Sequence, residues 1–185
     1  MSVWRRRAFV SLVLIGLVAC AGVVTSTADE TGTTAGAADA LAPELELLRP
    51  LLGPPRVGSY IDSAPGELEM TVQWEPVHDG NAVRFTKTVP EADFSMETLY
   101  YWSQLEDRIG FLTISNRGSI ARGDVRRDED GSIVLSGLEA SVDHETEFRT
   151  TFTVLPDGTV RDVFERFEER RFVRGHVIEY RLHGG

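Results

Sequence analysis

From residue 67 onward, hydrophobic and polar side chains alternate along the chain with a period of two. In the first such run the hydrophobic positions are Leu68, Met70, Val72 and Trp74, and polar residues stand between them. This alternation is typical of strands that bury one face and expose the other. Similar runs follow around Phe85 and over 96–102, 108–115, 119–127, 132–140, 145–155, 159–167 and 172–182.

Short turn sequences separate these runs, such as Asn116-Arg117-Gly118 and Pro156-Asp157-Gly158. With a first strand near 56–61, the pattern predicts about ten antiparallel strands joined by hairpins. An open sheet of this size would leave long unpaired edges, and closure into a barrel removes them. We therefore predict an all-β fold, a single antiparallel meander barrel.

A different spacing precedes the strands. Leu41, Leu45, Leu48 and Leu52 are three or four residues apart, which places them on one face of a helix. Pro50 limits the length of that helix. The sequence therefore predicts a short amphipathic helix that packs against the barrel.

The N-terminus has the pattern of an export signal. Three arginines, 5–7, precede an apolar run that begins at Ala8 and ends in Leu17-Val18-Ala19-Cys20. This ending resembles the lipobox of bacterial lipoproteins, in which cleavage leaves the cysteine as a lipid-modified N-terminus. Cys20 is the only cysteine of the chain, so it stands at the predicted lipidation site and no disulfide can form within the chain.

These patterns divide the chain into a signal peptide with lipobox (1–19), a lipidated cysteine and flexible tether (20–38) and a barrel domain (39–185). The tether is rich in small and polar residues. An uncleaved membrane helix, ordinary cleavage near residue 19 or 21, and twin-arginine export through Arg6-Arg7 are the alternatives. We expect the protein at the bacterial cell envelope, anchored on the outer face of the cytoplasmic membrane or on the outer membrane.

The charge of the chain restricts its partners. The formal net charge of −10 becomes −13 when the three signal-peptide arginines are removed. So acidic a surface argues against nucleic-acid binding, which needs a positive footprint. The histidines have no metal-ligand spacing, and no nucleophile motif or nucleotide fingerprint is present. We therefore expect no catalysis and no obligatory cofactor, and the oligomeric state stays open.

The stretch Leu45-x-x-Leu48-x-Pro50-Leu51-Leu52-Gly53 followed by a ten-strand meander resembles calycin-like (lipocalin-like) barrels. The resemblance spans 41–182 and is greatest to the nitrobindin-like group and its uncharacterised secreted relatives. Where that family has Gly-x-Trp-x-Gly in its first strand, this chain has Gly53-Pro54-Pro55-Arg56-Val57-Gly58 and lacks the tryptophan.

The nitrobindin resemblance implies haem binding through a histidine near the C-terminus. By position the matching residue is His176, and alternation groups it with Ile178, Tyr180 and Leu182 on the inward face. An inward neutral imidazole could ligate iron. The alternative is a histidine that is hydrogen-bonded within the barrel or at its rim.

Alternation also predicts which bulky side chains line the interior. Such a lining suits a small apolar or aromatic ligand, although the same side chains could fill a dry core. Lys87 and Arg122 stand an even number of residues from apolar neighbours on their strands, so alternation places them on the same face as those neighbours. A cation inside the barrel would point to an anionic ligand. The alternative is that both side chains reach solvent at strand ends. The predicted lining residues are Met70, Trp74, Phe85, Tyr100, Trp102, Phe111, Phe148, Phe152, Phe164 and Tyr180.

The sequence as a whole favours an envelope-anchored lipoprotein that binds a small, largely apolar ligand without catalysis. One alternative is a structural or interaction lipoprotein with a filled barrel, which would expose an apolar patch on its exterior. The other is a nitrobindin-like haem protein.

Overall fold

The computed structural model describes residues 41–61, 68–141 and 144–182. Each strand pairs antiparallel with its neighbour in sequence, and β1 pairs with β10 to close the sheet, so the predicted ten-stranded antiparallel barrel is confirmed. The signal peptide, Cys20 and the tether lie outside the described residues. The strands are β1 (Arg56–Tyr60), β2 (Met70–Val77), β3 (Ala82–Val89), β4 (Phe94–Ser103), β5 (Arg108–Ser115), β6 (Ile120–Arg127), β7 (Ile133–Ala140), β8 (Glu145–Val154), β9 (Val160–Glu168) and β10 (Arg171–Leu182).

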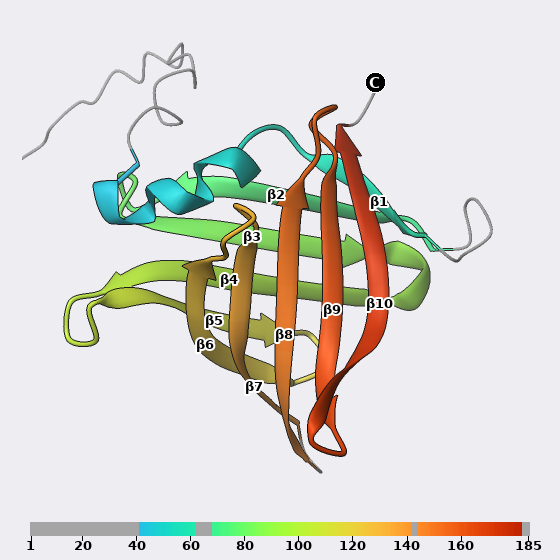
Figure 1. Ribbon diagram of the computed structural model, residues 1–185. Coiled ribbons are helices and arrows are strands. Elements are labelled where there is room, and N and C mark those ends of the chain that lie inside the picture. Colours follow the sequence, from blue (N-terminus) through green and yellow to red (C-terminus); the bar gives the residue numbers. More distant parts are fainter. Residues whose placement is uncertain (1–40, 62–67, 142–143, 183–185) are drawn as a thin grey trace, which may run out of the picture. The chain divides into compact units, whose positions relative to one another are not determined.

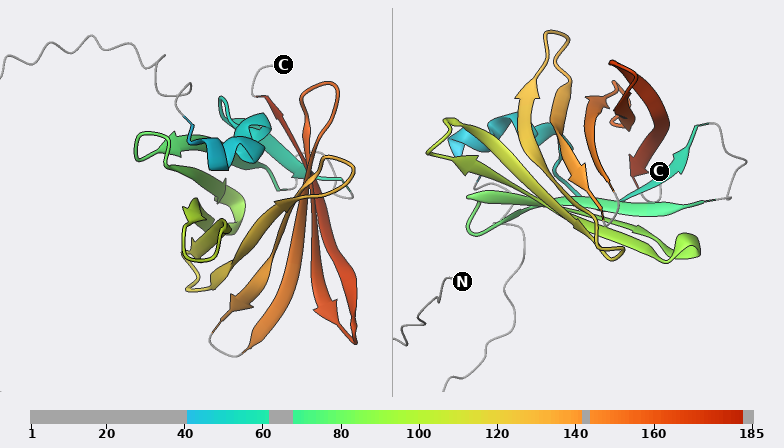
Figure 2. Two further views of the ribbon diagram at one scale, coloured as in Figure 1. Left: turned by 60° about the vertical axis from the view of Figure 1, so that its left-hand side comes forward. Right: turned by 90° about the horizontal axis from the view of Figure 1, so that it is seen from below.

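The two walls of the barrel run in different directions. In Figure 1, β2–β5 run across the page and β8–β10 run up it. The helix η1 (Pro43–Leu51) lies at one end of the barrel, which we call the helix end. Figure 2 shows β8–β10 extending away from η1. We call the opposite end, where the β3–β4, β5–β6 and β9–β10 turns lie, the far end.

The predicted N-terminal helix is present, and it is a 3₁₀-helix. Leu45, Leu48 and Leu51 have no exposed surface, whereas Leu52 is only half-buried. The prediction of Leu52 on the buried face was wrong because a 3₁₀-helix has three residues per turn, so every third residue faces the same way. Pro50, inside the helix, has no amide hydrogen to donate.

Hydrogen bonds fasten η1 to the helix end. The Ala42 amide donates to the Gly80 carbonyl in the β2–β3 turn at 3.0 Å. The Arg56 guanidinium donates to the Leu51 carbonyl at 2.7 Å, which satisfies a carbonyl at the end of the helix. The three buried leucines and these bonds close this end of the barrel.

The interior is aromatic. The Trp74 ring centroid lies 4.5 Å from that of Phe85, 5.6 Å from that of Phe152 and 5.9 Å from that of Tyr180. All ten predicted lining residues belong to the core or pack against it, with Trp102 and Phe164 only partly buried. Their contact with a ligand stays a prediction.

Two glycines let β6 and β7 approach closely. Gly123 and Gly137 face each other across these strands, and a Cβ atom on Gly137 would lie 2.2 Å from the Arg122 carbonyl oxygen. Phe111 and Phe148, their partners on β5 and β8, meet with ring centroids 6.0 Å apart. The aromatic rings therefore supply the side-chain contacts that the glycines lack.

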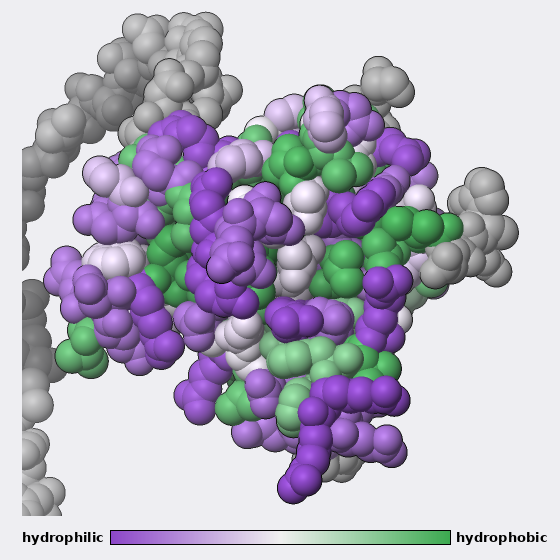
Figure 3. Space-filling model, viewed as in Figure 1, coloured by the Kyte–Doolittle hydropathy of each residue, from purple (hydrophilic) through white to green (hydrophobic). Residues whose placement is uncertain are grey.

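The exterior is mixed in character. On the face shown in Figure 3, hydrophilic side chains separate smaller hydrophobic areas. No helix within the described residues is long and apolar enough to cross a membrane.

Candidate ligand-binding site

Inward-facing side chains differ in exposure between the two ends. Near the helix end, side chains such as Trp74 and Val83 are completely buried. Toward the far end, Val89, Ser115 and Ala121 are buried, but other inward positions are half-buried: Tyr60, Met96, Thr113, Phe164 and His176. At this end the short 3₁₀-helix η2 (Pro90–Ala92) lies in the β3–β4 turn and Ala92 packs against the core, while part of the aromatic lining stays accessible to solvent.

A row of rings forms the lining there. Phe148 stacks on Phe164 with centroids 5.8 Å apart, and Phe164 stacks on His176 at 4.9 Å with the planes inclined by 13°. The edge of His176 meets Tyr60 at 5.5 Å. These residues come from β8, β9, β10 and β1, so the row crosses four strands.

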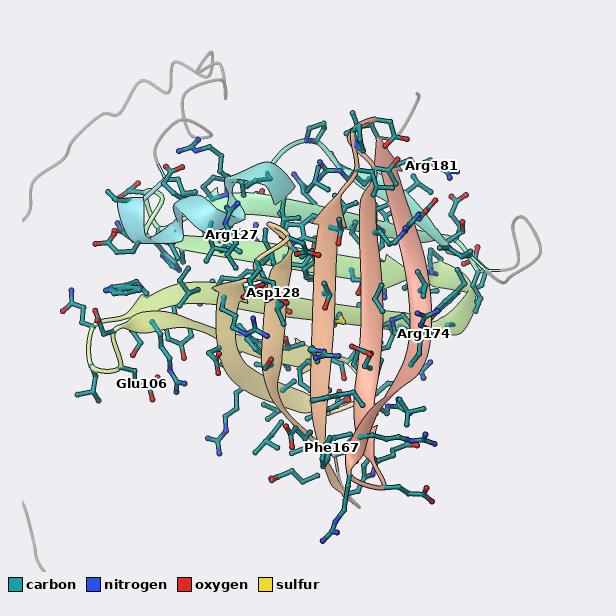
Figure 4. The ribbon with its side chains drawn as sticks, viewed as in Figure 1. Glu106, Arg127, Asp128, Phe167, Arg174 and Arg181 are labelled. Atoms are coloured by element: carbon teal, nitrogen blue, oxygen red, sulfur yellow. The ribbon has the colours of Figure 1, made fainter. Side chains whose placement is uncertain are left out.

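A β-bulge aims His176 into the barrel. The β9–β10 register shifts between Arg174 and His176, so that Arg174 pairs with Glu165 on the outer face and His176 pairs with Phe164 on the inner face. Gly175 stands at the bulge, where a Cβ atom would lie 2.8 Å from the Phe164 ring. Figure 4 labels Arg174 and Phe167, which mark the β9–β10 region of the barrel.

Lys87 is a cationic residue on the inner face of the barrel, toward the far end. It lies between Val72 and Met96 on neighbouring strands and is only 8% exposed. Desolvation lowers the pKa of its ammonium, and the nearby charge of Asp162 opposes that effect. Within the described residues the ammonium has no hydrogen bond and no ion pair. The Lys87 side chain is thus largely buried, whereas Arg122 is exposed.

Asp162 is a functional candidate that sequence reasoning missed. It is 6% exposed, its Oδ2 accepts a hydrogen bond from the Tyr180 hydroxyl at 2.9 Å, and its Oδ1 has no partner within the part of the chain that the structure describes. Burial raises the pKa of this carboxyl, and the charge of Lys87 partly offsets the increase. The sequence held one indication of this role: Asp162 stands two residues from both Val160 and Phe164, so alternation places its side chain on the same inward face as theirs.

His176 is neutral at pH 7. Desolvation, followed by the charges of Lys87 and Arg166, lowers its pKa to about 4. Its inward position and its protonation state fit a haem-iron ligand, which must be a neutral imidazole. Within the described chain, at His176 or at any other position, no group of three or more His, Cys, Asp or Glu residues could hold a metal ion.

Arg166 adds positive charge near the row of rings. It follows Asp162 and Phe164 at two-residue steps along β9, so all three share one face of the strand. Its guanidinium carbon lies 5.4 Å from the Phe164 ring centroid. Arg166 is exposed, so its charge meets solvent close to the half-buried lining.

Two exterior features lie apart from this interior. A pocket of about 350 Å³ on the outer wall is lined by Pro54, Pro55, Val57 and Thr71, none of which belongs to the predicted lining. An apolar patch on the outer faces of β5–β7 surrounds Arg122. It consists of Leu112, Ile114, Ile120 and Leu138, which are 39%, 54%, 47% and 39% exposed.

No known protein family matches this chain, and no curated protein matches its sequence. The closed antiparallel barrel is compatible with a calycin-like fold. Function therefore has to be argued from the interior itself.

Proposed function

We propose that the barrel binds a small, largely apolar molecule in its interior, without catalysis, and that the molecule enters at the far end. The observation that carries this proposal is the row Phe148–Phe164–His176–Tyr60, whose last three rings are half-buried; the same interior holds Lys87, whose ammonium has no hydrogen bond or ion pair within the described residues. Apolar surface with a few placed polar groups is the usual composition of a small-molecule site.

The helix end supports this direction of entry. Three fully buried leucines of η1 close it, whereas η2 at the far end is three residues long with none of them buried, and the Phe164, His176 and Tyr60 rings are half-buried. An apolar ligand gains about 0.8 kcal/mol for each methylene group that it buries. The polar groups would then orient the ligand rather than supply most of its affinity.

The test is a fluorescence titration with N-phenyl-1-naphthylamine, a neutral apolar probe, on the full chain carrying Cys20→Ala. We expect saturable binding with energy transfer from the interior tryptophans. Phe164→Ala should weaken binding at least fivefold, because Phe164 is central to the row of rings. Phe167→Ala is the matched control, since Phe167 lies on the same strand but is 40% exposed. Absence of saturable binding, or equal effects of both variants, would refute the proposal.

We also propose that the protein is a lipoprotein of the bacterial cell envelope, anchored through Cys20. The support is the Arg5–Arg7 segment, the apolar run and the sequence Leu17-Val18-Ala19-Cys20. Two or more acyl chains give stable anchoring, whereas one gives marginal binding. Radiolabelled palmitate should label the parent but not Cys20→Ala, and the variant should leave the membrane fraction.

Haem is a second candidate ligand, favoured by the inward, neutral His176. His176 would hold the iron, and haem would supply a site for a diatomic ligand. Addition of haem to the purified protein should then produce a Soret band that His176→Phe abolishes. A spectrum identical to that of free haem would remove this candidate.

The apolar patch favours a different candidate, an interaction lipoprotein whose barrel is filled. Photo-crosslinking in cells from position 114, compared with Arg161 on the outer face of β9, tests it. Crosslinks specific to position 114, together with no interior binding of the probe, would favour this candidate over ligand binding.

A further inference from the structure

We propose that the ligand is an organic anion, an apolar molecule with one carboxylate, and that the Lys87 ammonium binds this head group. The inference rests on the proposed function and names the chemical class of the ligand. It is carried by a buried amine that the described protein leaves without an acceptor.

Lys87 is the only lysine of the chain, which contains 18 arginines. The one ammonium therefore stands at a largely buried position, and Arg56 is the buried guanidinium on the other side of Val72. An ammonium is a compact point charge with three donors, whereas a guanidinium is a planar fork with five. Between Val72 and Met96 the compact group can direct its donors at one bound group.

The neighbouring carboxyl does not neutralise Lys87 directly. Asp162 interacts with it electrostatically but forms no ion pair with it, and its Oδ2 is already bonded to the Tyr180 hydroxyl. Burial favours the protonated form of Asp162, since it raises the pKa. A protonated Asp162 can donate through Oδ1, the oxygen that has no partner among the described residues.

Both unpartnered groups can therefore serve one ligand carboxylate. Lys87 would donate from Nζ, Asp162 would donate from Oδ1 when it is protonated, and a carboxylate accepts several such bonds. Arg166, exposed beside Phe164, adds positive charge where the ligand would approach. The neutral His176 adds no opposing or additional charge at pH 7. The apolar part of the ligand would then lie along the row of rings.

The single lysine makes a direct experiment possible. Selective isotope labelling of lysine in the full chain carrying Cys20→Ala produces one side-chain NMR signal, that of Lys87. The probes are decanoate and decanol, which share a ten-carbon chain and differ in the head group. We expect decanoate to bind about tenfold or more tightly than decanol, the range for a charge-assisted hydrogen bond, and to shift the Lys87 signal on saturation.

Lys87→Met tests the assignment and Arg122→Met is its matched control, because Arg122 is an exposed cation on the outer face. Lys87→Met should bind both probes with equal affinity, and its retained decanol affinity would show an intact interior. Arg122→Met should keep the preference for decanoate.

The outcomes separate this inference from the proposed function. Equal affinities of the parent for both probes, or a decanoate preference that survives in Lys87→Met, would overturn the anion assignment and leave interior binding in place. Failure of the parent to bind either probe would refute both proposals.

Discussion

The two ends of the barrel each hold a buried cation, and the two cations have different surroundings. Arg56, at the helix end, donates to the Leu51 carbonyl at 2.7 Å, and its guanidinium carbon lies 5.9 Å from the Trp74 ring centroid. Lys87, toward the far end, donates to nothing within the described chain. One cation thus fastens an element of the fold, and the other is available to a bound group. Burial alone therefore does not tell whether a charge has a structural or a binding role.

The apolar neighbours differ in the same way. At the helix end, the leucines of η1 are completely buried and close the barrel. At the far end, the rings of Phe164, His176 and Tyr60 are only half-buried. We infer that the helix end contributes mainly to stability, whereas the far end retains accessible apolar surface for binding.

The largest effect should come from removing a leucine at the helix end. Leu48→Ala deletes a completely buried side chain, and such substitutions cost about 2–5 kcal/mol of the free energy of unfolding. Urea unfolding measures this loss. Leu47→Ala is the control, because Leu47 is half-buried, and it should cost clearly less. Equal costs would show that η1 does not close this end of the barrel as described.

At the far end, acid should destabilise the fold through His176. Its pKa is about 4 in the folded protein and near 6.5 when unfolded, so the unfolded state binds a proton first as the pH falls. The stability that depends on the neutral imidazole is complete above pH 6.5 and is lost between 6.5 and 4. For a half-buried group we expect a loss of about 1–3 kcal/mol.

His176→Phe should reduce the slope of stability against pH between 6.5 and 4, since Phe can keep the stacking on Phe164 but cannot bind a proton. His144→Gln, at an exposed position, is the control. Urea unfolding at several pH values measures both slopes. A slope that is unchanged in His176→Phe would contradict the neutral, buried imidazole.

Arg56→Met should be moderately destabilising. The substitution removes the donor to the Leu51 carbonyl, and an unsatisfied buried acceptor costs about 1–3 kcal/mol. Relief from burying a charge offsets part of that cost, so we expect a net loss of about 1–2 kcal/mol. Arg122→Met, at the surface, should change stability by less than about 0.5 kcal/mol. Thermal unfolding of the two variants gives the comparison.

The alternation of hydrophobic and polar residues, together with the turn sequences, was sufficient to predict the barrel. Each hairpin brings neighbouring strands together, and the alternation shows which face of each strand is buried. It did not predict the type of η1, since leucines at 45, 48, 51 and 52 satisfy both α and 3₁₀ spacings. The choice between them depends on contacts with the barrel, which are not local in sequence.

The alternation of side chains predicted that Lys87 faces inward, but it did not predict how far from solvent Lys87 lies. How far a strand position lies from solvent depends on the stagger of strands around the closed barrel and on what covers each end. Asp162 was missed for a related reason, because a polar residue at an inward position becomes noticeable only once its partner, Tyr180, is known. The bulge at Gly175 also interrupts parity, so that Phe172 pairs with Phe167 on the outer face.

The smallest expected effect distinguishes the two cations most directly. Lys87→Met removes an ammonium from a largely buried side chain, and no acceptor among the described residues is left unsatisfied by its loss. Replacing buried charge by an apolar side chain of similar length is neutral or stabilising in such settings, so we expect a change between zero and a gain of about 1 kcal/mol, measured by urea unfolding without ligand. Arg56→Met, with the same change of charge, is the matched comparison. If Lys87→Met lost as much stability as Arg56→Met, both cations would be structural, and the ammonium would have a partner that a bound carboxylate would have to displace.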